Sequence, residues 1–503
     1  MTNTLAVAAL GEARWLWTII QWVALSYVIA LQAVQVALVV VVGVHATRRR
    51  RRPLSSIEED VFLHGLAPGI SVLVPAHNEA AGVEEAVRSL LALRYPNFEV
   101  VVVDDGSVDD TFGRLATAFD LIEVPCLAPG PLTVQGAVHS CHRSRHGEAL
   151  AVLRKASVGH KADALNAALN QARHPLVCMV DADSLLEPMA LSHLAGPFLE
   201  DPARVVVTGG VIRPVNDCVV RDGHLHQVRL ARRWLVRVQV VEYLRSFLVG
   251  RVAWSAMGGL LIVSGALGLF RRDAIIEAGG VRVGSVGEDA ELVVRLHRHL
   301  RNQRQDYRVV FVPEALCWTE TPAQWAPLGR QRRRWSRGLA ETLVAHRSML
   351  ANPRFGRIGL LAMPYLVLFE LCTPVVEVLG LIILGVSAAT GLVHVTVAVL
   401  LAALAVAAGT LVSVASLLVE QLALHRHRQR GDLALLLVAA LLENLGYRQL
   451  HAWWRLQGLI DAARGSRRGW GHLPRQGFGT ATPTGPSPSS PVFQPADHRP
   501  GGG

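Results

Sequence analysis

The hydrophobic pattern divides the chain into alternating apolar and mixed parts. Residues 15–44 carry no charged side chain, and a helix of this length, about 45 Å, can cross a bilayer. Residues 67–346 alternate between short β-rich runs and amphipathic stretches, and residues 347–460 are apolar again. The pattern predicts a transmembrane helix, a water-facing domain and a second membrane region. The remaining segments are 1–14, a basic linker at 45–66, and a basic, then Pro- and Gly-rich disordered tail at 461–503.

Four apolar runs in the middle part are typical of buried strands. They are ISVLVPAHNE, EVVVVDDGS, PLVCMVDADS and RVVVTGGVIRP. Apolar residues at helical spacing follow Asn78 and Lys161, whereas residues 126–136 are typical of a loop. This alternation predicts an α/β domain with an open sheet of parallel strands. In such sheets ligands bind beyond the carboxyl ends of the strands, where this chain places polar residues.

The second membrane region predicts an interfacial helix and two to three transmembrane helices. Residues 360–388, interrupted by two prolines, suit the interfacial helix and one span, and residues 392–420 suit another. Residues 432–460 form a third apolar block that includes Glu443 and Arg448. If this block crosses, the basic tail lies outside, against the positive-inside rule; if it lies flat, the tail stays in the cytosol. We favour the cytosolic tail.

Composition and charge support a membrane protein. The chain is 51% hydrophobic and only 18% charged, which disfavours a wholly soluble protein. Its net charge is +10, but the arginine clusters at 48–52, 330–337 and 426–430 lie beside apolar stretches. Anionic lipid explains such clusters better than nucleic acid does. The cluster at 48–52 places the middle domain in the cytosol, and the first span lacks the features of a cleaved signal peptide.

The six cysteines form no CxxC pair and have no histidine at zinc spacing. This predicts neither a disulfide framework nor a structural metal, and a reducing, cytosolic setting fits.

Two carboxylates end the third apolar run. Asp181 and Asp183 flank Ala182, and both can face one cavity if the backbone leaves the strand there. Two hard oxygen ligands one residue apart suit Mg²⁺ or Mn²⁺ bridging to a diphosphate. The alternative is a turn with solvated acids.

A second acidic pair, Asp104 and Asp105, ends the preceding apolar run. These carboxylates can accept hydrogen bonds from a base or a ribose, or close an Asx turn. Among 50 basic residues the only lysines are Lys155 and Lys161. A compact ammonium on a phosphate would explain Lys161, although chance is the alternative.

Two further segments carry candidate chemistry. Asp289, beside Glu288, can deprotonate a hydroxyl, or the pair can simply complement a helix dipole. In QRRRWSRG, helical spacing places Gln331, Arg334, Trp335 and Gly338 on one side, so that an Arg can grip a diphosphate and a Trp can stack on a sugar. We expect Arg330, Arg332, Arg333 and Arg337 to contact solvent or the membrane surface. Trp318 is an aromatic candidate or a core residue.

Some motifs do not occur in the sequence. It has no GxxxxGK[ST] loop, no GxGxxG after a strand, no HExxH and no GxSxG. Kinase, dehydrogenase, zinc hydrolase and serine hydrolase functions therefore lose their main support.

Six motifs in order, VPAHNE, VVVDDGS, GHKADALN, VDADS, GEDAEL and QRRRW, lie between residues 71 and 338. They resemble the membrane-embedded family-2 glycosyltransferases, which include cellulose, chitin and hyaluronan synthases. Bacterial poly-N-acetylglucosamine synthase-like proteins are the most similar in length and in the pattern of apolar and mixed segments. The resemblance implies a GT-A fold flanked by transmembrane helices, and inverting transfer of a sugar.

The resemblance also implies residue roles. On the donor side the expected residues are Glu79, Asp104 or Asp105 for the uridine, Lys161 near the nucleotide, and Asp181 and Asp183 for Mg²⁺ or Mn²⁺ and the diphosphate. On the acceptor side they are Asp289 as general base, Arg334 on the leaving diphosphate, and Trp335 with Gln331 framing the glycan end. Two local departures are Gly159-His160-Lys161 in place of Gly-Gly-Lys, and Gly287-Glu288-Asp289 in place of Thr-Glu-Asp.

The function expected from the resemblance is transfer from a UDP-sugar, UDP-N-acetylglucosamine, onto a growing β-linked polysaccharide at the inner membrane, with the catalytic domain in the cytosol. Expected partners are the polysaccharide acceptor, membrane lipids and accessory membrane or periplasmic export subunits, and no nucleic acid. The span count is low for a secretion channel. The alternatives are a non-processive transferase acting on a lipid or lipid phosphate, and a non-catalytic membrane scaffold.

Overall fold

The computed structural model describes residues 2–49, 67–126, 130–147, 149–391, 395–424 and 430–465. Most of the predicted basic linker, the arginine cluster at 426–430 except for its last residue, and the tail from residue 466 lie outside these ranges.

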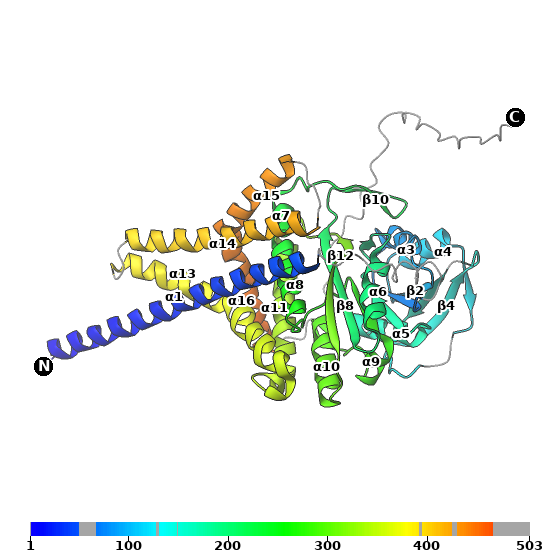
Figure 1. Cartoon of the computed structure of the whole chain (residues 1–503), viewed down its shortest axis with the longest axis horizontal. Coiled ribbons are helices and arrows are strands. Elements are labelled where there is room, and N and C mark those ends of the chain that lie inside the picture. Colours follow the sequence, from blue (N-terminus) through cyan, green and yellow to red (C-terminus); the bar gives the residue numbers. More distant parts are fainter. Residues whose placement is uncertain are drawn as a thin grey trace, which may run out of the picture.

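A ten-stranded sheet in the order β3-β4-β5-β2-β1-β6-β11-β8-β12-β7 forms the centre of the middle domain (Figure 1). Seven strands point the same way: β1 (Ile70–Ala76), β2 (Phe98–Asp105), β3 (Leu121–Val124), β5 (Leu150–Lys155), β6 (Leu176–Met179), β8 (Val205–Pro214) and β12 (Arg308–Thr319). The other three run antiparallel to them: β4 (Val138–Ser144), β7 (Ser184–Leu186) and β11 (Gly268–Arg271). The predicted α/β domain with a mostly parallel sheet is confirmed. The four predicted strands are β1, β2, β6 and β8.

Helices cover both faces of the sheet because successive strand residues point to opposite sides. Val72 and Val74 of β1 pack in one core with α3 (Val83–Leu91), α4 (Thr111–Ala118) and α6 (Ala190–Glu200). Leu73 packs in the other core with α5 (Lys161–Gln171), α9 (Arg272–Glu277) and α10 (Glu288–Asn302). The domain is therefore a three-layered α/β/α unit. The apolar helices lie at the opposite end of the molecule from β4 and α4 (Figure 1).

Between β8 and β11 the chain makes a hairpin and a buried helical segment. The hairpin consists of β9 (Val219–Arg221) and β10 (His224–Gln227), and the helical segment of α7 (Trp234–Tyr243), the π-helix η1 (Leu244–Gly250) and α8 (Arg251–Ala256). This segment contacts α1 (Thr2–Arg49), α14 (Val395–Leu424) and α15 (Arg430–Leu442). It therefore joins the sheet domain to the apolar helices.

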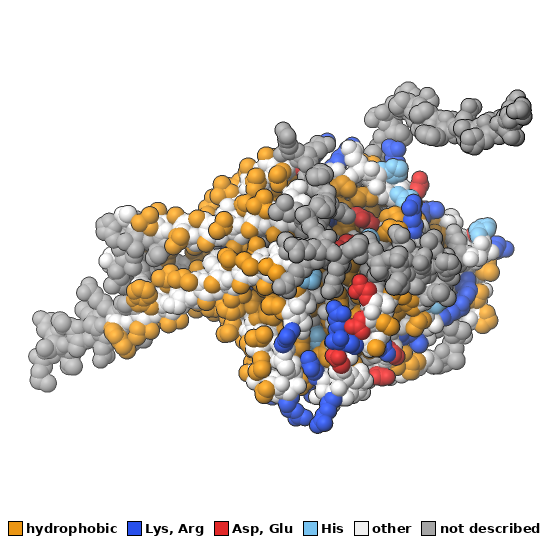
Figure 2. All heavy atoms as spheres, viewed as in Figure 1, with side chains coloured by type: hydrophobic (Ala, Val, Ile, Leu, Met, Phe, Trp, Pro, Cys, Tyr) orange, Lys and Arg blue, Asp and Glu red, His pale blue; other side chains and the backbone are white. Residues whose placement is uncertain are grey.

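Four segments are long and apolar enough to cross a membrane. They are Ile19–His45, Ile358–Ala389, Ala402–Gln421 and Gly431–Ala463. The helices α1, α13 (Thr373–Ala389) and α14 extend away from the sheet on one side (Figure 1), where hydrophobic side chains cover the surface (Figure 2). The described end of α1 that carries Arg48 and Arg49 is the end nearest the sheet domain.

The third apolar block is a broken helix. Leu445 and Gly446 leave the helical conformation, and Gly446 has a φ of +92°, which glycine adopts without strain. The break separates α15, about 20 Å long by its 13 residues, from α16 (Arg448–Ala463). Neither half alone matches the roughly 30 Å of bilayer hydrocarbon. Instead, α15 packs against α7, and α16 packs against α13 and α11 (Trp325–Ala345).

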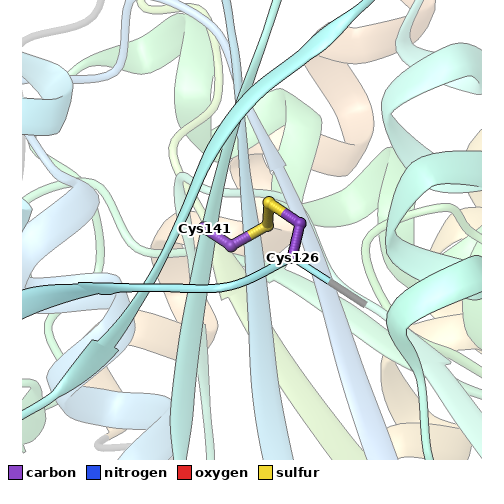
Figure 3. The surroundings of a disulfide bond; sticks show 2 residues. All are labelled: Cys126 and Cys141. Carbon is purple, nitrogen blue, oxygen red and sulfur yellow. A yellow bond between two sulfur atoms is a disulfide. The ribbon is translucent and has the colours of Figure 1, made fainter. Parts of the chain in front are cut away.

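The expectation of no disulfide is wrong. Cys126 and Cys141 are bonded, with their Cα atoms 5.3 Å apart (Figure 3). No spacing motif marks this pair, because strand pairing brings it together: Val124 of β3 lies opposite Cys141 of β4, and Cys126 follows two residues later. Disulfides are rare in reducing compartments, so the cysteines no longer support a reducing setting.

Replacing Cys126 with serine is expected to destabilise the β3–β4 edge by about 3 kcal/mol, because the disulfide closes a loop over a sequence separation of 15 residues. Thermal unfolding in detergent, with and without dithiothreitol, measures this. The reductant should lower the melting temperature of the unmodified chain and leave that of Cys126→Ser unchanged. Equal melting temperatures throughout would contradict the prediction.

Candidate active site

A cavity of about 1310 Å³ opens at the carboxyl ends of the central strands and continues between the apolar helices. Its lining includes residues of α1, the α7–η1–α8 segment, α11, α13 and α16. Eight of the ten predicted site residues line it: Glu79, Lys161, Asp181, Asp183, Asp289, Gln331, Arg334 and Trp335. Groups far apart in the sequence therefore share one space.

Asp181 and Asp183 lie in the bend between β6 and β7. Ala182 between them is buried in the core, while both carboxylates face the cavity. The contacts of Asp183 include the hydroxyls of Thr319 at 3.4 Å and Ser184 at 3.5 Å. Within the described ranges no group of three or more His, Cys, Asp or Glu side chains could hold a metal ion. Two carboxylates beside open space suit a cation that takes its remaining ligands from substrate and water.

Lys161 begins α5, and its ammonium group joins the two acidic segments. Nζ contacts Asp181 Oδ1 and lies 3.8 Å from Glu288 Oε1. Burial alone would lower the pKa of Lys161, but the charges of Asp181, Glu288 and Asp289 raise it above its ordinary value. The ammonium therefore stays charged at neutral pH, as the proposed phosphate contact requires.

Glu288 and Asp289 form the first turn of α10. Asp289 Oδ2 accepts a hydrogen bond from the Gly265 N–H at 2.9 Å, which fixes the carboxylate at the cavity wall. Burial raises the pKa of Glu288; Lys161 lowers it, Asp289 raises it further, and the net shift is upward. Of the two acids, Asp289 has the backbone anchor that holds a base in place.

A backbone contact brings α11 against this acidic turn. A Cβ at Gly338 would lie 2.9 Å from Gly287 N. The two backbone segments therefore approach more closely than any side chain at Gly338 would allow. Gln331, Arg334 and Trp335 then line the same cavity as Asp289. Trp335 remains 39% exposed, with its ring centroid 6.5 Å from that of Tyr243 and 6.3 Å from that of Phe247. An aromatic surface of this kind can receive a sugar ring.

The expectation that Arg332 contacts solvent or membrane is wrong, whereas Arg333 keeps 33% of its side chain exposed. Arg332 is 1% exposed, pairs with Glu242 at 2.9 Å, and stacks over Trp335 with 4.3 Å between guanidinium carbon and ring centroid. Arg333 pairs with Asp461 of α16. Helical periodicity could not identify these partners, because they come from α7 and α16.

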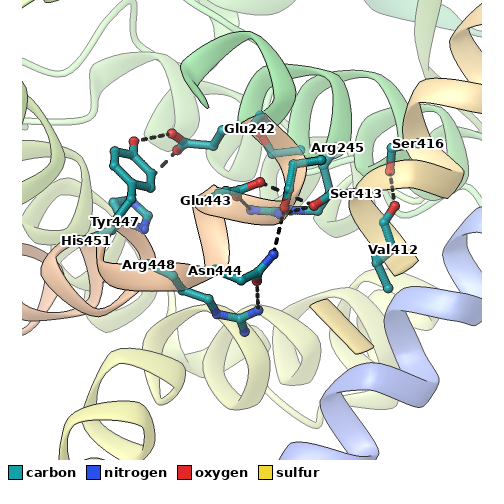
Figure 4. A network of polar contacts seen from close by, with 12 residues as sticks. Glu242, Arg245, Val412, Ser413, Ser416, Glu443, Asn444, Tyr447, Arg448 and His451 are labelled. Carbon is teal, nitrogen blue, oxygen red and sulfur yellow. Dashed lines mark hydrogen bonds and ion pairs between the residues drawn. The ribbon is translucent and has the colours of Figure 1, made fainter. Parts of the chain in front are cut away.

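Glu242 takes part in a buried polar network (Figure 4). Its carboxylate accepts a hydrogen bond from Tyr447 Oη at 2.7 Å and lies 3.8 Å from His451. Burial alone would raise the pKa of Glu242, but Arg332, His451 and the Tyr447 hydroxyl bring it down to about 2. The network therefore ties the helix that carries Trp335 to α7 and α16.

Asp104 and Asp105 do not line the cavity. Asp104 Oδ1 accepts a hydrogen bond from the Ser107 N–H at 3.1 Å, which is the turn contact considered from the sequence. Asp105 is fully buried and lies 2.5 Å from Lys155 Nζ, which also pairs with Asp163 at 2.9 Å. Lys155 is thus a structural cation beneath the strand ends. A uridine contact of either aspartate stays a prediction.

Trp318 is 4% exposed and packs in a small core with Leu185, Val215, Cys218 and Val220. Its alternative role as a core residue is therefore the observed one.

The α7–η1–α8 segment supplies site residues that sequence reasoning missed. Tyr243, Phe247 and Arg251 line the cavity together with Glu242 and Arg245. Their sequence signal is three charged residues, Glu242, Arg245 and Arg251, within the mostly apolar stretch VEYLRSFLVGR. Charged residues are seldom buried unless they are paired or functional.

The chain is similar in sequence to a known family and to named relatives. Residues 68–338 match the family described as glycosyltransferase like family 2. A poly-beta-1,6-N-acetyl-D-glucosamine synthase of Staphylococcus epidermidis is 26% identical over 281 residues, 56% of this chain and 57% of the relative. The synthase of the same name from Staphylococcus aureus strain COL is 26% identical over 307 residues, 60% of each chain. The chain therefore aligns with rather more than half the length of these curated relatives.

A solved structure shares the fold. The mannosyltransferase PcManGT of Pyrobaculum calidifontis, in complex with GDP-Man and Mn²⁺, superposes with a TM-score of 0.53 at 20% sequence identity. The match covers 88% of this chain and 99% of that one. It confirms the GT-A fold that the resemblance implied. Since the family profile matches more than half of the residues, the chain belongs to the glycosyltransferase-like family 2.

Proposed function

We propose that the chain is a membrane-bound inverting glycosyltransferase that moves N-acetylglucosamine from UDP-N-acetylglucosamine onto a growing β-linked polysaccharide. The observation that carries this proposal is the shared cavity: Asp181, Asp183, Asp289 and Arg334 line it together, and it continues between the candidate spans. The relatives' name, poly-beta-1,6-N-acetyl-D-glucosamine synthase, supports the sugar and the polymer.

On the donor side, each group has a charge that suits its role. Lys161 and Arg334 line the cavity and would stabilise the charge that the diphosphate gains as the sugar leaves. Asp181 and Asp183 would hold Mg²⁺ or Mn²⁺, which would neutralise charge on that diphosphate. Asp289, whose carboxylate accepts hydrogen bonds from the N–H groups of Gly265 and Ala290, would accept the proton of the acceptor hydroxyl.

The charges in the cavity's membrane-side arm favour a neutral glycan as acceptor. This arm is lined by Gln32, Gln35, Glu370, Thr373, Glu377, Arg448 and Arg455. Arg448 lies 2.6 Å from Glu377, and Arg455 lies 3.1 Å from Glu370, so both cations already have carboxylate partners. A lipid phosphate, the alternative acceptor, would need cations that are free to receive it.

The test is to give purified full-length protein in detergent a panel of UDP-sugars with Mg²⁺ or Mn²⁺. UDP release and product size are both measured. We expect UDP-N-acetylglucosamine to give the fastest UDP release and long products. Short products alone would contradict the polymerase function. Sugar in the lipid extract would favour the lipid-acceptor alternative. No UDP release from any donor would contradict the enzyme function.

Asp183→Asn is expected to raise the Mg²⁺ or Mn²⁺ concentration needed for half-maximal turnover by about tenfold or more, because one of two carboxylate ligands is lost. A metal titration of UDP release measures this. Asp201→Asn is the matched control, since this carboxylate pairs with Arg308 at the other end of the sheet. An unchanged titration curve for Asp183→Asn would place the metal elsewhere.

A further inference from the structure

Arg251 is a buried cation that has no carboxylate partner among the described residues. It begins α8, is 9% exposed, and lines the cavity. Its guanidinium carbon lies 4.2 Å from the centroid of the Phe247 ring. Among the described residues it has no ion pair within 4.0 Å, and its buried Nη1 has no hydrogen-bond partner. An unsatisfied buried guanidinium is costly, so the site needs another group to satisfy it.

Other arginines of the cavity lining are already engaged. The carboxylate pairs are Arg245–Glu443 at 2.6 Å, Arg332–Glu242 at 2.9 Å, Arg337–Glu341 at 2.6 Å, Arg448–Glu377 at 2.6 Å, Arg455–Glu370 at 3.1 Å, and Arg333–Asp461. Arg330 is exposed, and Arg334 is assigned to the leaving diphosphate. Within the described part of the lining, Arg251 is the buried arginine that remains unused.

The surroundings of Arg251 place it on the acceptor side. Burial lowers its pKa to about 10, and the charge of Asp289 acts in the opposite direction, so the side chain stays charged near the base. Phe247, on which it stacks, lies 4.5 Å from Tyr243 and 6.3 Å from Trp335 between ring centroids. Arg251 therefore packs with these three rings on the wall of the cavity that Asp289 also lines.

We propose that Arg251 binds the acceptor, its Nη1 donating a hydrogen bond to an oxygen of the terminal acceptor sugar next to the hydroxyl that Asp289 deprotonates. This rests on the proposed function and adds a residue to its acceptor site. A neutral sugar oxygen fits better than an anion, because the carboxylate of Asp289 would repel an anion and the three rings offer faces for a sugar.

The experiment measures transfer to a defined neutral oligosaccharide over a range of acceptor concentrations, with donor hydrolysis in the absence of acceptor as the internal reference. Arg251→Gln should raise the acceptor KM by about ten- to hundredfold, the loss expected for one charged hydrogen bond, and leave donor hydrolysis within about twofold. Arg251→Lys keeps the charge but loses the planar fork, so about a three- to tenfold rise is expected. Arg237→Gln, in α7 and outside the cavity lining, is the matched control.

The outcomes separate this inference from the proposed function. If the unmodified chain releases no UDP, the proposed function fails. If it transfers sugar but Arg251→Gln and Arg251→Lys keep its acceptor KM, the inference about Arg251 fails. Should Arg251→Gln not fold, the acceptor KM of Arg251→Lys decides. A preference of more than about tenfold for an acceptor ending in a uronic acid, lost in Arg251→Gln, would overturn the assignment to a neutral oxygen.

Discussion

Replacing Asp289 with asparagine is expected to slow sugar transfer by about 10²- to 10⁴-fold, the range in which a general base contributes. The amide has the size of the carboxylate, and its oxygen can still accept the hydrogen bond from the Gly265 N–H. The turn at the start of α10 should therefore keep its shape, so that the loss reports the missing base. Initial rates of transfer and the affinity for the UDP-sugar are measured together, and only the rate should change.

The matched control for Asp289 is Asp306→Asn, because Asp306 is an exposed carboxylate paired with Arg204 at 2.9 Å. Its rate should stay within about twofold of the unmodified chain, as expected for a surface ion pair. If Asp289→Asn transfers sugar at the full rate, another group is the base. If cells that need this protein also tolerate the change, the non-catalytic scaffold gains support.

Replacing Glu242 with alanine is expected to destabilise the folded protein by about 3–5 kcal/mol, because Arg332 would keep its buried charge and lose its carboxylate. The Tyr447 hydroxyl would lose its acceptor in the same step. Denaturant unfolding in detergent measures the loss. Glu341→Ala, which removes the partner of Arg337 in a partly exposed i,i+4 pair, should cost about 0.5 kcal/mol or less.

A double substitution sharpens this test. Glu242→Leu with Arg332→Met removes both charges at once and should recover much of the stability lost in Glu242→Ala, since apolar replacements of buried pairs are often near neutral. The double variant should still elongate poorly, because Trp335 loses the cation that stacks on its ring. A double variant as unstable as Glu242→Ala would show that the pair's charges are not the cause.

The fold and much of the site follow from local pattern. The apolar strands β1, β2, β6 and β8 were predicted because a strand buried on both faces is a continuous apolar run. Their polar ends then had to meet at one edge of a parallel sheet. Asp181 and Asp183 follow one of these strands directly, whereas Lys161 and Asp289 begin helices and were assigned to the same site by the family resemblance.

The parts that pattern could not predict depend on partners distant in sequence. Cys126 and Cys141 meet only because β3 pairs with β4. Arg332 has the spacing of a solvated arginine, yet it is buried by Glu242, which lies 90 residues earlier. The break at Gly446 turns α16 back onto α11, and a hydropathy average cannot register one positive φ. Arg251 was missed because no motif marks it: what distinguishes it is that its Nη1 has no hydrogen-bond partner among the described residues.

The contact between Gly287 and Gly338 has a consequence for how the chain tolerates substitution. A methyl group at Gly338 would come within 3.0 Å of the Gly287 backbone, which cannot yield as a flexible side chain can. Any larger residue at Gly338 would push α11, which carries Arg334, away from the turn that carries Glu288 and Asp289. In a saturation library scored for activity, Gly338 should therefore rank beside Asp289 in intolerance, although it contributes no functional group.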